Sequence, residues 1–129
     1  MIRQPNAKAL ILYIEDDSSL AQMYKFKMER EGIQVILAVD GREGVKMAQE
    51  QKPDLILLDI LMPELDGWWA LKLLKSDSHT KDIPVIVLTN LDAELFVKQA
   101  QEAGAVDFLV KAKLTPSQVL EKIKEKLKK

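Results

Sequence analysis

The sequence predicts an α/β fold, namely a doubly wound parallel sheet with helices on both faces. Short aliphatic runs alternate with segments of helical periodicity five times, every connection is short, and the runs are continuously apolar. Continuous apolar runs are typical of strands that are buried on both faces of a parallel sheet. Right-handed crossovers then place helices on both faces, and ligands bind at the carboxyl ends of the strands.

The first two units occupy the N-terminal part of the chain. A strand near 9–14 precedes a helix near 18–31, which ends at Gly32. Apolar residues recur along this helix at helical spacing: Leu20, Met23, Tyr24 and Met28. A second strand near 33–38 precedes a helix near 41–50.

Three further units complete the pattern. A strand at 54–58 precedes a turn at Met62 and a helix from about Asp66 to Ser76. A strand at 84–88 precedes a helix at about 92–103, which Gly104 closes. The last unit is a strand at 107–110 and a helix that opens with Thr115 as cap and Pro116 at its first position.

Composition limits the classes of function. We expect the 129 residues to form one domain over 1–129, and the absence of cysteine excludes disulfides, thiolate catalysis and cysteine-ligated zinc. The net charge of -1 argues against a nucleic-acid surface. The N-terminus lacks an apolar signal core, and no apolar stretch approaches the roughly 18 residues of a membrane span. We therefore expect a cytoplasmic protein without direct nucleic-acid or membrane partners.

Carboxylates follow two of the predicted strands directly. The first run leads into Glu15, Asp16 and Asp17, and the third leads into Asp59. Because parallel strands end on one edge of their sheet, these acids should converge there. Crowded carboxylates repel one another unless a hard divalent cation lies among them. This edge is therefore predicted to bind Mg²⁺.

The strand ends carry further residues in a recognisable order. Thr89 ends the fourth strand, Lys111 follows the fifth, and Asp59 is followed by Met62-Pro63 and Asp66-Gly67. Ala103-Gly104-Ala105 precedes the fifth strand. With Glu15-Asp16, these residues resemble the receiver domain of two-component response regulators, over a core of about 7–127. The resemblance is to stand-alone, chemotaxis-regulator-like members, and it implies a flavodoxin-like sheet of five parallel strands in the order 2-1-3-4-5, flanked by five helices.

The resemblance also implies roles at the acidic edge. Asp59 would accept a phosphoryl group from a histidine kinase or phosphotransfer protein, assisted by Lys111. Asp59 and Asp16 would bind Mg²⁺ directly, with Glu15 beside it through water and the backbone carbonyl of Leu61 as a further ligand. The domain would catalyse only its own phosphorylation and dephosphorylation, as a signalling module and not as a turnover enzyme.

A conformational switch is implied in the same way. Thr89 would turn toward the phosphoryl group, and Phe108 would move into the vacated space. The fourth helix, fifth strand and fifth helix would then present a changed surface to a downstream protein or to a second copy of the chain.

Departures from the family pattern give further expectations. Ala112 stands where proline usually follows the lysine, so we predict a trans Lys111-Ala112 bond. Trp69 and Leu95 should face outward. Leu61 and Leu91 should flank the path of an attacking water, and because neither can hold that water, the phosphorylated state should be long-lived.

Two other functions compete with this interpretation. The first is a receiver-like scaffold that binds partners without accepting phosphate, although the complete set Glu15, Asp16, Asp59, Thr89 and Lys111 argues against it. The second is an aspartyl-phosphate hydrolase, which would need a carboxylate two residues after the nucleophile, where this chain has Leu61.

Overall fold

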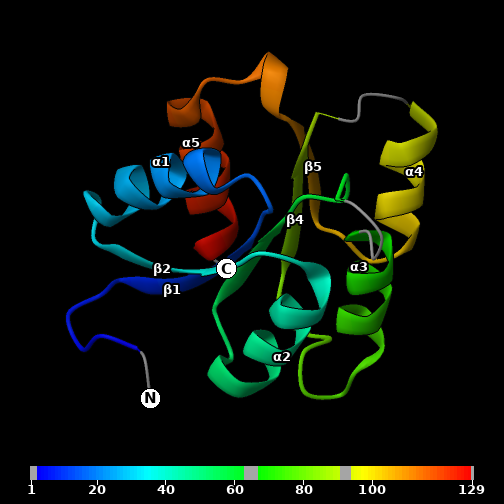
Figure 1. Cartoon of the computed structure of the whole chain (residues 1–129), viewed down its shortest axis with the longest axis horizontal. Helices are drawn as coiled ribbons and strands as arrows, with labels where there is room; N and C mark the ends of the chain where they lie inside the picture. Colours follow the sequence, from blue (N-terminus) through cyan, green and yellow to red (C-terminus); the bar gives the residue numbers. More distant parts are fainter. Residues whose placement is uncertain (1–2, 63–66, 91–93, 129) are drawn as a thin grey trace.

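The computed structural model describes residues 3–62, 67–90 and 94–128 (Figure 1). Five parallel strands form one sheet in the order β2-β1-β3-β4-β5, which confirms the predicted fold class and strand order. The strands are β1 Ala9–Ile14, β2 Ile33–Ala38, β3 Leu55–Leu58, β4 Val85–Thr89 and β5 Asp107–Val110. The helices are α1 Ser18–Glu29, α2 Gly41–Gln51, α3 Gly67–Ser76, α4 Glu94–Glu102 and α5 Pro116–Leu127, and Lys111–Lys113 forms a short 3₁₀ helix.

The helices cover the two faces of the sheet. Helices α1 and α5 lie on one face, and α2, α3 and α4 lie on the other (Figure 1). Each face has its own apolar core, and the alternation of side chains along β1 divides its residues between the two. Leu10, Leu12 and Ile14 belong to the core under α2, α3 and α4, whereas Ile11 and Tyr13 belong to the core under α1 and α5.

Some predicted boundaries are wrong, for local reasons. Helix α1 ends at Glu29 and not near residue 31, because the chain tightens into i to i-3 hydrogen bonds before Gly32 at φ +84°. Strand β4 begins one residue later than predicted, since Pro84 has no amide to donate, and it extends to Thr89. The 3₁₀ turn after β5 was not predicted. Met23 does not join the core, because its side chain is 37% exposed.

Side-chain hydrogen bonds fix where several elements begin. Asp17 caps α1 by accepting from the Leu20 amide at 3.1 Å, and Thr115 forms a capping box at the start of α5. At the opposite ends of the strands, before β3, the Asp54 carboxylate accepts from the Leu10 amide at 2.8 Å and forms an ion pair with Arg3 at 2.8 Å. Within the described ranges, no helix is long and apolar enough to cross a membrane.

Candidate functional site

The predicted acidic edge forms where β1 and β3 end side by side. Ile14 and Leu58 are in register, and the Asp59 amide donates to the Ile14 carbonyl at 3.1 Å. The Glu15 amide donates to the carbonyl of Ala38, at the end of β2, at 2.9 Å. The residues that follow the strands are therefore held by the sheet itself, and the acids converge as the sequence predicted.

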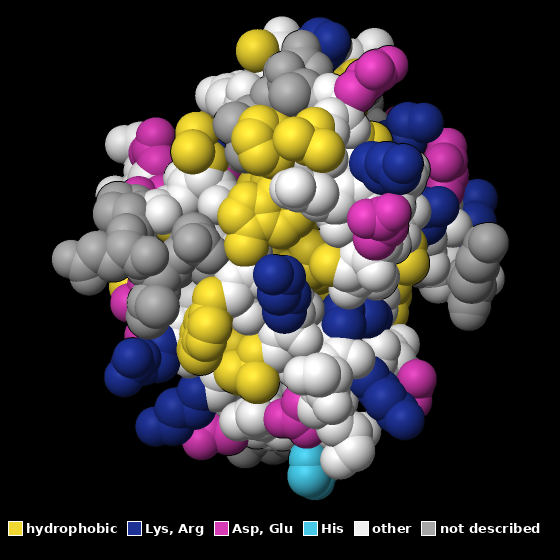
Figure 2. Space-filling model, turned by 90° about the vertical axis from the view of Figure 1, so that its right-hand side faces the viewer, with side chains coloured by type: hydrophobic (Ala, Val, Ile, Leu, Met, Phe, Trp, Pro, Cys, Tyr) yellow, Lys and Arg dark blue, Asp and Glu magenta, His cyan; other side chains and the backbone are white. Residues whose placement is uncertain are grey.

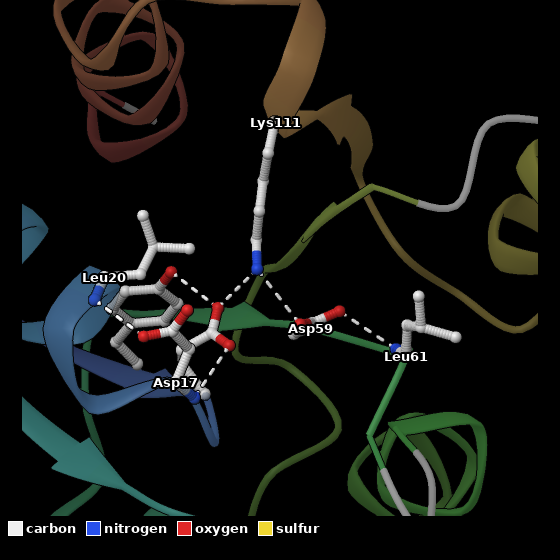
Figure 3. A network of polar contacts seen from close by, with 7 residues as sticks. Asp17, Leu20, Asp59, Leu61 and Lys111 are labelled. Carbon is white, nitrogen blue, oxygen red and sulfur yellow. Dashed lines mark hydrogen bonds and ion pairs between the residues drawn. The ribbon is translucent and has the colours of Figure 1, made fainter.

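Lys111 reaches the acids from the end of β5 (Figure 3). Its ammonium lies 2.6 Å from Glu15 Oε1 and 3.0 Å from Asp59 Oδ2. The side chains are 11% exposed for Lys111, 1% for Glu15 and 6% for Asp59. One largely buried cation thus pairs with two buried carboxylates, which an ordinary solvated surface lysine does not do.

Glu15 is held by two more donors, which sequence reasoning missed. The Tyr13 hydroxyl donates to Oε1 at 2.9 Å, and the Asp17 amide donates to Oε2 at 3.2 Å. A signal for the first was present, because residues two apart in a strand point to the same side, and Tyr13 is the one polar-tipped residue in an aliphatic run.

Burial and charge perturb this group of side chains together. Burial raises the pKa of Glu15, although the hydrogen bond and charge of Lys111 oppose the rise. Burial alone would lower the pKa of Lys111, but its bonds to Glu15 and the charge of Asp59 raise it. Burial and the nearby Glu15 charge raise the pKa of Tyr13, so its hydroxyl keeps its proton and remains a donor.

The carboxylates suit a hard cation. Among the described residues, Glu15, Asp16 and Asp59 each offer an oxygen within 4.8 Å of the others. Asp16 is exposed, so a hydrated ion could reach the cluster from solvent. Carboxylate oxygens and retained waters are the ligands that Mg²⁺ prefers, so these residues fit the predicted ion. Leu61 contacts the site through its amide, which donates to Asp59 Oδ1 at 2.9 Å.

The two predicted switch residues lie on the neighbouring strands. Thr89 is fully buried at the end of β4 and pairs in register with Val110, the residue before Lys111. Phe108 is half-buried and packs against the core under α2, α3 and α4. No peptide bond in the described ranges is cis, which confirms the trans Lys111-Ala112 bond.

Gly67 places α3 directly against the residue after β3. A Cβ at Gly67 would lie 2.4 Å from both the Asp59 carbonyl oxygen and the Ile60 Cα. No side chain fits at that distance, so glycine is required for this approach. The predicted Pro63, Asp66 and Leu91 lie outside the described residues.

Apolar side chains gather on the side of α3 and α4 (Figure 2). Leu95 is 61% exposed and Trp69 is 37% exposed, which confirms that both face outward. Trp68 instead packs against the core and against Phe96, with ring centroids 6.2 Å apart.

Comparisons with known proteins agree with this geometry. Residues 11–124 match the response regulator receiver domain family. Protein PilH of Pseudomonas aeruginosa is 41% identical over 105 residues, which cover 80% of this chain and 85% of PilH. The transcriptional regulator PhoP of Bacillus subtilis is 36% identical over 88% of this chain, which matches only 46% of PhoP.

Solved structures show the same fold. The Francisella response regulator 1452 receiver domain superposes with a TM-score of 0.86 at 30% identity, covering 94% of this chain and 98% of that one. The Vibrio cholerae chemotaxis protein CheY4 gives a TM-score of 0.85 at 29% identity, covering 92% and 98%. The acidic cluster at the strand ends and these matches lead to one conclusion: the chain belongs to the response regulator receiver domain family and has a phosphoacceptor role.

Proposed function

We propose that Asp59 accepts the phosphoryl group and that Lys111, Glu15 and Asp16 assist it. The observation that carries this proposal is the Lys111 ammonium 3.0 Å from the Asp59 carboxylate, with two further carboxylates close by. Phosphoryl transfer depends mainly on positioning and charge neutralisation, and this arrangement provides both.

The reaction on Asp59 is a displacement at phosphorus. A carboxylate oxygen of Asp59 attacks, the P–N bond of a phosphohistidine donor breaks, and the imidazole nitrogen takes up a proton. Lys111 neutralises charge on the incoming phosphoryl oxygens, and the Leu61 amide holds the other oxygen of Asp59. Mg²⁺, when held by Glu15, Asp16, Asp59 and the Leu61 carbonyl, would supply further charge neutralisation.

The signal would leave the site through β4 and β5. A phosphoryl group adds roughly -1.5 to -2 charges beside Asp59. We propose that Thr89 donates to it and that Phe108 repacks, which alters the surface of α4, β5 and α5. The burial of Thr89 beside Val110 supports this route, since Val110 is the residue directly before Lys111.

Receiver domains are signalling modules that interact with histidine kinases or phosphotransfer proteins. We propose such a donor here, and a downstream protein or a second copy of this chain on the switched surface. The chemistry would be limited to the domain's own phosphorylation and dephosphorylation. One domain over 1–129 and a cytoplasmic location stay predictions, and the family match over 11–124 supports the first.

Intact mass after incubation with acetyl phosphate and Mg²⁺ tests the proposal. The wild type should gain one phosphoryl mass, and Asp59→Asn should gain none. Asp54→Asn is the matched control, because Asp54 lies at the opposite end of β3 and should leave labelling unchanged. An unlabelled wild type would favour the binding-scaffold alternative, and hydrolysis of a phosphate monoester such as p-nitrophenyl phosphate would favour the hydrolase.

A further inference from the structure

Tyr13 brings a hydroxyl into the site from the core side of β1. The residue is fully buried, and its ring packs edge-on against Tyr24, with centroids 5.9 Å apart and planes at 88°. Its hydroxyl donates to Glu15 Oε1 at 2.9 Å. Tyr13 lies in β1, and the Glu15 amide directly after the strand donates to the Ala38 carbonyl at 2.9 Å, so packing and backbone together hold this donor on Glu15.

Glu15 Oε1 has a second donor in Lys111, at 2.6 Å. Glu15 is only 3% exposed, and a buried carboxylate oxygen that loses its donors is costly. Because two donors contact this oxygen, either donor can move away and the oxygen still accepts a hydrogen bond from the other. Lys111 is the one with a reason to leave, because a phosphoryl group on Asp59 would present three acceptor oxygens beside the ammonium.

We infer that Tyr13 is a positioning residue that keeps Glu15 hydrogen-bonded when Lys111 turns from Glu15 to the phosphoryl group on Asp59. The inference rests on the proposed roles of Asp59 and Lys111. Without the Tyr13 hydroxyl, Lys111 would be the sole donor to Glu15 Oε1 among the described residues, and its departure would leave that oxygen without a hydrogen bond from them. The phosphorylated state would then be less favourable, whereas the resting site would change little.

Two dissociation constants, measured for the Tyr13→Phe variant and the wild type, distinguish the positioning role of Tyr13 from a role in core packing alone. The first is for Mg²⁺ alone, and the second is for beryllofluoride, a phosphoryl mimic, at saturating Mg²⁺. Emission of Trp68 and Trp69, at the start of α3, can follow both titrations. The beryllofluoride constant should rise about 10- to 150-fold, the loss expected for one hydrogen bond to a charged group, and the Mg²⁺ constant should change less than about twofold.

The split between the two constants is the diagnostic result. A structural defect in the site would weaken both to a similar degree, since both ligands need the same carboxylates. A beryllofluoride constant within about twofold of wild type, or an equal rise in both constants, would overturn the inference.

Tyr24→Phe is the matched control, because it removes a phenol hydroxyl from the ring that packs on Tyr13. It should leave both constants within about twofold of wild type, and a rise in the beryllofluoride constant equal to that of Tyr13→Phe would assign the effect to ring packing and overturn the inference. A second test repeats Tyr13→Phe in a Glu15→Asp background, where the shorter side chain draws the carboxylate away from the hydroxyl. The substitution should have almost no further effect there, and an undiminished effect would mean that Tyr13 acts elsewhere.

Labelling separates this inference from the proposed function. If the wild type is phosphorylated and Asp59→Asn is not, while Tyr13→Phe leaves the beryllofluoride constant unmoved, only the role of Tyr13 is wrong. If the wild type is not phosphorylated at all, the proposed function fails, and the inference fails with it.

Discussion

Removal of the Lys111 charge should lower the free energy of unfolding, and the burial of its two carboxylate partners determines by how much. Lys111→Ala would leave the two carboxylates that it contacts, both buried, without their cation. Breaking a buried ion pair costs about 3–5 kcal/mol. Glu15 keeps its bonds from Tyr13 and the Asp17 amide, so we expect the lower end, about 3 kcal/mol. With an unfolding entropy of about 2.1 cal/mol/K per residue over 129 residues, this lowers the unfolding temperature by about 10 °C.

Thermal unfolding followed by circular dichroism, in EDTA and in millimolar Mg²⁺, measures this loss. Mg²⁺ should restore more stability to Lys111→Ala than to the wild type, because in the variant the ion supplies the only cation among the acids. Lys122→Ala, at an exposed lysine of α5, is the control and should unfold at the wild-type temperature. A drop of less than about 3 °C in EDTA, or an equal Mg²⁺ effect in both proteins, would refute the reasoning.

The same variant should show a defined pH dependence. The raised pKa of Glu15 means that the folded state holds its proton to higher pH than the unfolded state, whose ordinary value is 4.5. The stability cost of charging Glu15 therefore grows as pH rises above that value, and it is larger without Lys111. The raised pKa of Lys111 gives the wild type stability that is complete below 10.5 and is lost as pH rises through its higher folded value. The difference between wild type and Lys111→Ala should thus be greatest near neutral pH and shrink toward both extremes.

Four further variants test other parts of the structure. Asp16→Ala should abolish the Mg²⁺ response of tryptophan emission without lowering the unfolding temperature, because Asp16 is exposed; an unchanged titration would move the ion elsewhere. Gly67→Ala should lower the free energy of unfolding by about 1–3 kcal/mol, since its Cβ would collide with backbone, and urea denaturation would measure it. Burial alone would raise the pKa of Asp54, but its ion pair and backbone hydrogen bond lower it below 3.8, so its stabilisation is present above that pH and lost as pH falls through the lower folded pKa. Asp54→Asn should therefore cost at most about 1 kcal/mol at pH 7, discounted because the side chain is partly exposed, and nothing in strong acid; a constant difference across pH would contradict this. Leu61→Asn should speed the decay of the phosphorylated protein, followed by intact mass over time, because a polar side chain can hold the attacking water; slower decay would disprove the shielding argument.

Position along the chain was enough to predict most of the site. Asp59 and Lys111 each follow a strand directly, and the geometry of a parallel sheet brings such residues to one edge whatever the helices do. The hydrogen bond from Tyr13 to Glu15 could not be predicted with the same ease, because it depends on side-chain torsions and on the packing of the Tyr24 ring. The sharing of Lys111 between two acids depends on side-chain reach in the same way.

The errors in the fold have similar physical origins. Met23 keeps the helical spacing of the apolar residues on α1, but the buried face of α1 is narrow and consists of Ala21, Tyr24 and Met28, so the Met23 side chain meets solvent. The 3₁₀ turn at Lys111–Lys113 directly follows β5. Three residues are too few to show an apolar periodicity, so the sequence pattern gave no sign of this turn.

The contact between Gly67 and the Asp59 backbone also defines where this protein can be engineered. A Cβ at position 67 would collide with backbone, whereas the side chain of Trp69, two residues later, lies at the surface. Within one helical turn, the chain therefore passes from a position that resists substitution to one that faces outward. A fluorophore placed at position 69 would stand on the helix whose first residue touches the acceptor backbone. It would make the chain a candidate biosensor for its own phosphorylation, with the label outside the reaction site.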